Sequence, residues 1–420
     1  MTELGPAPFN NDILGPILNF DVLLHIIDQS ESQKSKLAMM STCRLLYREG
    51  VKTLLRGQVV LGLSQKQLKL FLSFLLKEPN VRYRRLRDLR LDTYDLSSRL
   101  AQKFGSVCPM MTSLERLEMG YPETMLLSHP AVMKGLAQLK SLKHLKLASA
   151  GEKVHKLLKL LHAPLQTLSV CWIPDVPIDD SFWDNIDTEY WPHCHPTILL
   201  ENFADTLEEL TCQWWHMPEQ YLPPRKTYPR MRRLSIESVT FRFIFNLVPF
   251  IRAFPNLTNL LVETHLGEYG SMDEMLQIFR DSHLYNVVEQ TLAPSDGSAW
   301  RCIQEFSGSF VDLYFFGLAC PVNRLVLKDS SNTTQIPFPA DVLSFTRPTY
   351  LDYTTYIYDD FDSGLGLLSS GLREAKPFAL ARLKTLFIRF WFACSDPDSH
   401  FPDAMVRRAF TLLFHILTAA

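Results

Sequence analysis

The stretch LERLEMG occupies residues 114–120, and three close relatives occur elsewhere in the chain: LRDLRLD at 86–92, LKHLKLA at 142–148 and MRRLSIE at 231–237. All four place an apolar residue before two variable residues, a leucine, one variable residue and another apolar residue. The pattern is found nine times, in copies that begin at residues 86, 114, 142, 165, 207, 231, 257, 322 and 383. Such repetition predicts one supersecondary unit used many times.

The spacing of the copies indicates the size of this unit. Successive copies start 28, 28, 23, 42, 24, 26, 65 and 61 residues apart, and the short intervals match or approach the roughly 20–29 residues of a leucine-rich repeat. In a short strand alternate side chains share one face, so the last two apolar positions of each copy point into a common core. Intervening segments such as EKVHKLLKLLHA space their apolar residues like the buried face of a helix.

A single strand-plus-helix unit cannot bury its own apolar side, but stacked neighbours can. We therefore predict an α/β repeat fold, an irregular leucine-rich-repeat solenoid from about residue 80 onward. The long intervals then hold insertions or units that the pattern misses. The alternative is a chance series of leucine-rich amphipathic helices. Nine copies, most of them with a proline or a polar turn close upstream, favour the solenoid.

Composition narrows the class of protein. The chain has 420 residues, 46% of them hydrophobic, and a net charge of -2, which gives no global reason to expect a nucleic-acid binder. Its eight cysteines include no C-x-x-C pair, as is typical of reduced intracellular thiols. The N-terminus does not resemble a secretory signal, and the most apolar stretches are too short to span a bilayer. We expect a cytoplasmic or nuclear protein that contacts neither membrane nor nucleic acid.

Residues 17–62 have the pattern of a small helical unit. One apolar stripe at helical spacing runs over residues 22–27, with Asn19 or Asp21 available as its cap. After a polar segment, a second helix is expected to carry apolar residues at 37–47 and to end at Gly50. A third apolar group closes the unit. Its core is too small to stand alone, so we expect it to pack on a partner or on the solenoid.

This order of residues resembles an F-box. The carrying pattern is Leu-x-x-Asp-Val-Leu-x-x-Ile-Ile, a polar loop, and Leu-x-x-Met-x-x-Cys-Arg-x-x-Tyr, although Leu18-Asn19 stands where the family usually has Leu-Pro. An F-box followed by leucine-rich repeats is similar to the substrate receptors of cullin-RING (SCF) ubiquitin ligases, especially those common in fungi. The resemblance implies a non-enzymatic receptor whose box binds a small adaptor joined to a cullin scaffold and whose repeats bind a protein substrate.

The same resemblance implies an adaptor-binding surface drawn from the apolar residues of the box: Leu18, Phe20, Val22, Leu23, Ile26, Ile27, Leu37, Met40, Cys43 and Leu46. The alternative for each of them is a place in the core of the unit itself. The alternative function of the whole chain is a leucine-rich-repeat interaction scaffold with a degenerate box and no ligase role.

The expected domain organisation follows from these patterns. We expect a disordered N-terminus at 1–16, the F-box-like unit at 17–62, a linking helix at 63–80, the solenoid with insertions at 81–400, and a C-terminal helix or cap at 401–420.

The least ordinary composition lies between the fourth and fifth copies of the motif. Residues 160–224 contain no Lys or Arg but eleven acids, and five of the seven tryptophans lie at 172–215. Aromatic anchors surrounded by acids suit a basic partner segment, because rings supply contact area and carboxylates steer association. The candidate substrate-binding residues are Trp172, Asp179, Asp180, Trp183, Asp184, Trp191, Trp214 and Trp215. The alternative is that the tryptophans cover the repeat edge and the acids keep a long loop hydrated.

Other signals in the chain are weaker. The run RYRRLRDLR at 82–90 has five arginines and is expected to form a solvated face with Asp88 as a partner. His193 and His195 do not by themselves define a zinc site. Walker, nucleophile-elbow and H-E-x-x-H signatures are all lacking, so we expect neither catalytic residues nor a metal or other cofactor.

Overall fold

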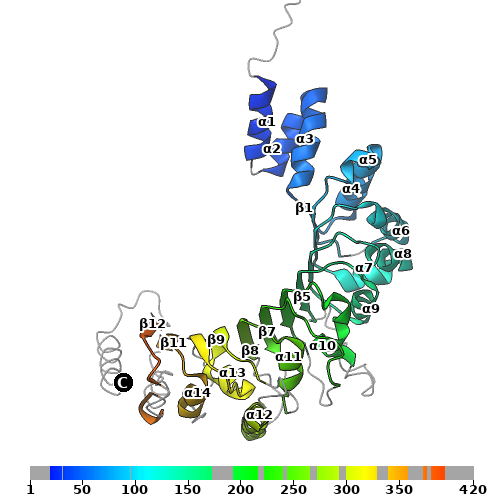
Figure 1. The fold of residues 1–420 in the computed structure, drawn as a ribbon. Helices are drawn as coiled ribbons and strands as arrows, with labels where there is room; N and C mark the ends of the chain where they lie inside the picture. Colours follow the sequence, from blue (N-terminus) through cyan, green and yellow to red (C-terminus); the bar gives the residue numbers. More distant parts are fainter. Residues whose placement is uncertain are drawn as a thin grey trace, which may run out of the picture.

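The computed structural model describes eleven segments of the chain, namely residues 19–30, 32–94, 96–172, 193–215, 222–239, 244–264, 272–292, 299–328, 339–357, 372–375 and 380–392. The expected N-terminal and C-terminal segments, 1–16 and 401–420, lie outside these residues. Helices come first, and strands then alternate with helices along an arc (Figure 1).

Twelve strands form one parallel sheet, and each strand pairs with its neighbours in chain order. The strands are β1 (Gln58–Leu61), β2 (Asp88–Leu91), β3 (Arg116–Met119), β4 (His144–Leu147), β5 (Thr167–Cys171), β6 (Glu209–Gln213), β7 (Arg233–Val239), β8 (Asn259–Thr264), β9 (Ile303–Ser309), β10 (Val322–Lys328), β11 (Tyr350–Ile357) and β12 (Thr385–Phe392). This sequential order confirms the predicted α/β repeat fold, because each repeat contacts chiefly the next.

Helices lie along the outer side of the arc and strands along its inner side (Figure 1). After the three N-terminal helices they are α4 (Gln65–Lys77), α5 (Pro79–Arg82), α6 (Ser98–Val107), α7 (Pro122–Ser128), α8 (Pro130–Leu136), α9 (Glu152–Leu160), α10 (Pro196–Leu199), α11 (Val248–Ala253), α12 (Met272–Leu292), α13 (Phe310–Phe316) and α14 (Pro339–Thr346), with 3-10 turns η1 (Cys108–Met110) and η3 (Glu201–Phe203).

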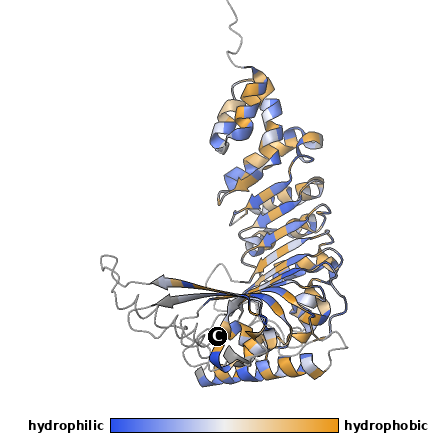
Figure 2. Ribbon diagram, turned by 60° about the vertical axis from the view of Figure 1, so that its left-hand side comes forward, coloured by the Kyte–Doolittle hydropathy of each residue, from blue (hydrophilic) through white to orange (hydrophobic). Residues whose placement is uncertain are grey.

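All nine motif copies lead into strands, which are β2 to β8, β10 and β12. Their leucines stack in register across the sheet, as Leu117, Leu145 and Leu168 show. These three side chains are at most 3% exposed, so they form the continuous apolar ladder that the repeat predicts. Each repeat carries both hydrophobic and hydrophilic residues (Figure 2), and from β2 to β6 the residues that alternate with the buried positions are at least partly exposed.

Strands β9 and β11 fill the two long intervals of the motif. In β9 the inward positions fall on Ile303 and Phe306, and Phe306 pairs with Leu325 of β10. In β11 they fall on Leu351 and Tyr353, which are both fully buried. In β9 Phe306 stands where the pattern has leucine. In β11 the leucine is present as Leu351, but Pro348 and Tyr353 hold the first and last positions of the pattern, which therefore missed both units. β1 was also missed, since it lies within the range expected for the box.

The N-terminal unit contains α1 (Phe20–Gln29), α2 (Gln33–Met40) and α3 (Arg44–Arg56). Asn19 caps α1 by accepting a hydrogen bond from the Asp21 amide at 3.1 Å, as predicted. The predicted end at Gly50 is wrong, because the helix boundary falls at residues 41–43 and Gly50 lies inside α3. A Cβ at Gly50 would stand 2.5 Å from Cγ of Met40, so glycine serves close packing of α3 on α2.

The expectation of a solvated arginine run at 82–90 is wrong for Arg82. Its side chain is buried, its guanidinium lies 4.2 Å from the Phe74 ring centroid and 5.6 Å from that of Tyr47, and Nη1 donates to the Phe74 carbonyl at 2.7 Å. Tyr47 belongs to α3 and Phe74 to α4. Arg82 therefore connects the helical unit to the first repeat through cation–π contacts. Asp88 pairs with Arg116 instead of an arginine of the run.

Candidate functional site

The helical unit divides its apolar residues between core and surface. Of the ten expected adaptor-binding residues, Leu18 lies outside the described residues. Three are buried in the core of the unit: Ile27, Met40 and Leu46. Three are half-buried and pack against that core: Phe20, Leu23 and Cys43. Three are exposed: Val22, Ile26 and Leu37. For the three buried residues, the alternative of a place in the core of the unit is therefore the one that burial supports.

The exposed apolar side chains of the helical unit are Val22 (45% exposed), Ile26 (41%), Leu37 (52%) and Leu45 (37%), and we call them the box surface residues. Val22 and Ile26 are one turn apart, so they lie on the same face of α1. Leu45, on α3, was not among the predicted residues. The resemblance implied its neighbour Leu46 for adaptor binding, but Leu46 is buried and Leu45 is the exposed one of the pair.

The described tryptophans of residues 160–224, which we call the tryptophan window, do not form the predicted contact surface. Trp172 and Trp215 are 3% and 0% exposed, so the expectation that these two rings anchor a substrate is wrong. Their centroids are 5.1 Å apart in an edge-to-face contact, and Trp215 Nε1 donates to the Cys194 carbonyl at 3.0 Å. They follow β5 and β6 directly and fold over the repeat core. Trp214 is half-buried and also packs on that core.

The remaining predicted substrate-binding residues, Asp179, Asp180, Trp183, Asp184 and Trp191, lie outside the described residues, so their role stays a prediction.

Buried histidines form a polar cluster under these tryptophans. His195 Nδ1 lies 2.7 Å from Thr197 Oγ1, and His155 Nε2 lies 3.7 Å from Cys194 Sγ. Burial lowers the pKa of His155 to about 4 and of His195 to about 3, and it raises the pKa of the Cys194 thiol to about 11. Neutral imidazoles beside a protonated thiol act as packing and hydrogen-bonding groups, since nucleophilic attack requires a thiolate.

Within the described segments no group of three or more His, Cys, Asp or Glu side chains is arranged to hold a metal ion.

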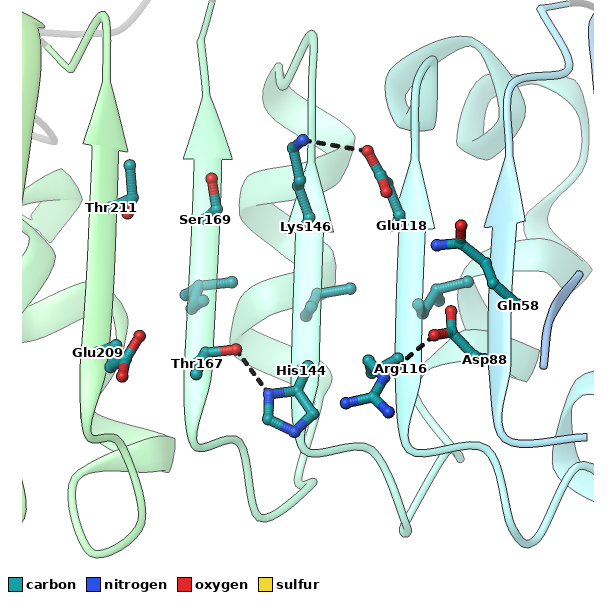
Figure 3. A pocket seen from close by; sticks show the side chains of 13 residues that line it. Gln58, Asp88, Arg116, Glu118, His144, Lys146, Thr167, Ser169, Glu209 and Thr211 are labelled. Carbon is teal, nitrogen blue, oxygen red and sulfur yellow. Dashed lines mark hydrogen bonds and ion pairs between the residues drawn. The ribbon is translucent and has the colours of Figure 1, made fainter. Parts of the chain in front are cut away.

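The inner side of the arc carries a shallow surface lined by outward-pointing strand residues (Figure 3). A depression of about 230 Å³ crosses β1 to β6, and a second one of about 460 Å³ crosses β6 to β9. They share Glu209 and Thr211, so they adjoin. We call this the concave surface, made by Gln58, Asp88, Arg116, Glu118, His144, Lys146, Thr167, Ser169, Glu209, Thr211, Arg233, Ser235, Asn259, Leu261, Glu305 and Ser307.

Charges on the concave surface are paired across neighbouring strands. Arg116 Nε lies 3.0 Å from Asp88 Oδ2, and Lys146 Nζ lies 3.1 Å from Glu118 Oε1 (Figure 3). Further along the sheet, Arg233 pairs with Glu209 at 2.7 Å. Exposed pairs of this kind add little stability. They do place positive and negative side chains, which can donate or accept hydrogen bonds, at fixed spacing on the sheet.

Small hydroxyl side chains occupy the middle of the concave surface. From β5 to β7, the position level with Lys146 is held by Ser169, Thr211 and Ser235. Their small size produces the hollow, and their hydroxyls can donate or accept hydrogen bonds. His144 Nδ1 lies 2.9 Å from the Thr167 hydroxyl, and burial followed by the nearby Arg116 lowers the pKa of His144. The surface is thus broad, polar and neutral in its centre.

The C-terminal end of the sheet has a different character. Phe387 and Trp391 of β12 are 47% and 60% exposed. Asp352 on β11 is buried and lies 2.9 Å from Arg389 Nη2 and 3.8 Å from Arg324 Nη2. The sequence alone did not indicate the contact of Asp352 with these arginines, because β11 lacked a recognised motif and both arginines are far from Asp352 in the chain.

A scan against models of known protein families and a search of curated proteins both give no match. The order of strands and helices shows an α/β repeat solenoid preceded by a small helical unit. Among the described helices, none combines the length and apolar content needed to cross a bilayer.

Proposed function

We propose that this chain is the substrate-recognition subunit of an SCF-type ubiquitin ligase. In this proposal the helical unit docks the adaptor, which is joined to a cullin scaffold, and the concave surface holds a protein substrate. The observation that carries it is the set of box surface residues. A three-helix unit that keeps Val22, Ile26, Leu37 and Leu45 at 37–52% exposure has apolar area for a partner beyond its own core.

The concave surface supports the second half of the proposal. Two adjoining shallow depressions across nine strands suit an extended protein segment better than a small molecule, which is normally enclosed in a deep apolar cleft. The paired charges and the hydroxyls can form hydrogen bonds with a polar segment of either positive or negative charge. In this proposal the main substrate contact lies on the inner side of the sheet, and a contribution from the residues of the tryptophan window outside the described segments stays a prediction.

The proposed mechanism is proximity, and the chain itself performs no chemistry. A bound substrate would be held near the ubiquitin-charged enzyme recruited by the cullin. Its acceptor lysine would then react at a high effective concentration. A rigid connection between box and solenoid serves this role. The buried Arg82, which contacts Tyr47 of α3 and Phe74 of α4, contributes to that connection.

The adaptor half is tested by pull-down of the full chain with purified adaptor. Val22→Asp and Ile26→Asp each bring a carboxylate into the apolar contact, which costs several kcal/mol, and we expect adaptor affinity to fall about 100-fold or more. Both residues are exposed, so the fold should persist. Leu23→Asp is a poorer test because Leu23 is half-buried and packs on the core of the unit.

Leu127→Asp is the matched control, since Leu127 on α7 is 60% exposed and far from the box. If the adaptor does not bind the unmodified chain at micromolar concentration, the ligase proposal fails. The alternative function, an interaction scaffold with a degenerate box, then stands.

The substrate half is tested by proximity labelling in cells, with and without proteasome inhibition. Thr211 lines both depressions, so Thr211→Trp should block the hollow and remove the labelled proteins that accumulate under inhibition. Leu127→Trp places the same ring on the outer side of the arc and should leave that labelling unchanged. If Thr211→Trp keeps the full set of labelled proteins, the substrate does not lie on the concave surface.

A further inference from the structure

Helix α12 buries an apolar side chain, Phe279, in its first half and polar side chains in its second half. Its inward side chains Asn286 and Gln290 are polar and only 0% and 2% exposed. Asn286 accepts from the Leu247 amide at 2.8 Å and donates to the Phe245 carbonyl at 2.9 Å, while Gln290 donates to the Gly317 carbonyl at 2.8 Å. Hydrogen bonds to neighbouring backbone thus hold α12 in place.

The outward side of α12 is apolar over its second half. Leu284, Val288 and Leu292 are 63%, 37% and 79% exposed and follow one another at four-residue spacing, with Tyr285 beside them. Single exposed leucines are ordinary, but a row on one helix face that folding leaves unburied marks a contact surface. The helix is also acidic, with Asp273, Glu274, Asp281 and Glu289 against the single cation Arg280.

Helix α4 presents a surface of opposite charge. Leu70 and Leu76 are 60% and 39% exposed, and Leu63, just before the helix, is 64% exposed. The charged residues of α4 are all lysines, Lys66, Lys69 and Lys77, and they are exposed. The face opposite them, which includes Leu68 and Leu72, is fully buried in the first repeat. α4 therefore offers leucine side chains surrounded by positive charge.

We propose that α4 of one copy of this chain docks on α12 of a second copy. The two surfaces match in kind, since each combines exposed leucines with charge, and the charges are of opposite sign. They cannot meet within one chain. α4 precedes β2 and α12 follows β8, and six strand-to-strand steps of about 4.8 Å separate those strands by roughly 30 Å along the arc (Figure 1).

Two different surfaces make this contact heterologous, so after pairing one copy still has a free α12 and the other still has a free α4. Association of this type continues into chains of copies unless the geometry closes a ring. Neither surface includes the box surface residues or the concave surface, so the proposal stands or fails separately from the ligase role. The 13 residues of α4 extend only about 20 Å, which predicts a small interface of the weak, transient class.

The test is sedimentation velocity of the full chain from ~1 to ~100 μM, where the unmodified protein should form dimers and larger species. Raising the ionic strength from ~0.1 to ~1 M cuts the Debye length from about 10 to about 3 Å and should weaken the association several-fold. Leu284→Lys places a cation against the lysines of α4, and Leu70→Glu places an acid against the acids of α12. Each variant alone should stay monomeric, and Leu127→Glu, at an equally exposed position, should associate normally.

A mixture of Leu284→Lys and Leu70→Glu proteins separates this proposal from other contacts. The first variant keeps α4 and the second keeps α12, so the mixture retains one intact pairing and should form at least a 1:1 dimer. Three results would overturn the proposal: an unmodified chain that is monomeric at ~100 μM, a single variant that associates like the unmodified chain, or a mixture that stays monomeric. In the first case the α12 surface serves another protein.

Discussion

Acid is expected to weaken the repeat that contains His155 and His195. Both imidazoles are at most 6% exposed, and burial lowers their pKa to about 4 and about 3 from an ordinary 6.5. In the unfolded chain they take up protons near pH 6.5, whereas in the folded chain they resist protonation to much lower pH. Their contribution to stability is therefore complete above pH 6.5 and is lost as the pH falls below it.

The size of this effect follows from the pKa difference. At pH 5 the unfolded histidines are protonated and the folded ones are not, so each costs about 1.36 × (6.5 − 5), or about 2 kcal/mol. The two together remove about 4 kcal/mol between pH 7 and pH 5. His155 also has Lys156 and Lys159 nearby, which lower its pKa further, and Glu152, which opposes them.

His195→Asn isolates one of the two contributions. His195 is the N-cap of α10, where its Nδ1 accepts from the Thr197 amide at 3.3 Å, and asparagine can cap the same position without titrating. The smaller side chain leaves space beside Phe250 and lowers stability at neutral pH. Between pH 7 and pH 5, the free energy of unfolding of the His195→Asn protein should nevertheless fall by about 2 kcal/mol less than that of the unmodified chain.

Urea unfolding followed by tryptophan fluorescence measures this difference, because the buried Trp215 donates to Cys194 next to His195. An unchanged dependence on pH in His195→Asn would refute the reasoning, since it would mean that His195 is hydrated or already protonated in the folded chain.

Two further predictions concern capping and packing. Glu123 accepts hydrogen bonds from the amides of Lys153 and Val154 at 2.8 and 3.0 Å, and so it caps α9. Glu123→Ala should lower the free energy of unfolding in urea by about 1–3 kcal/mol, and an unchanged unfolding midpoint would contradict this. Gly135→Ala should lower the same free energy of unfolding by at least about 1–3 kcal/mol, because its Cβ would stand 2.1 Å from a backbone oxygen of α6. Gly57→Ala is the control, since no atom lies within 4 Å of a Cβ at that position.

Much of the fold could be predicted from the sequence because the strand period is local. An apolar residue two positions after a leucine fixes which side of a strand faces the core, whatever lies next to it. The nine motif copies therefore located nine strands. The same logic missed β9, where Phe306 replaces the leucine, and β11, where Pro348 and Tyr353 flank Leu351, because the pattern admits only aliphatic and similar residues at these positions.

The sequence determined less about the candidate sites. It marked the apolar stripe of the box, but it could not separate the exposed Val22 from the buried Ile27 in the same helix. That choice depends on where α2 and α3 pack. Likewise, Trp172 and Trp215 are 43 residues apart, and only the pairing of β5 with β6 brings their rings into contact inside the core.

The sequence by itself determined that the chain repeats a strand-and-helix unit after a helical start, since periodicity and turn residues act within a few positions. The tertiary structure alone decided which polar residues share a surface. Asp88, Arg116 and His144 belong to three different repeats, and the parallel register places them side by side. Register is set by burial of the leucine ladder on the other side of each strand, so the concave surface is a consequence of core packing.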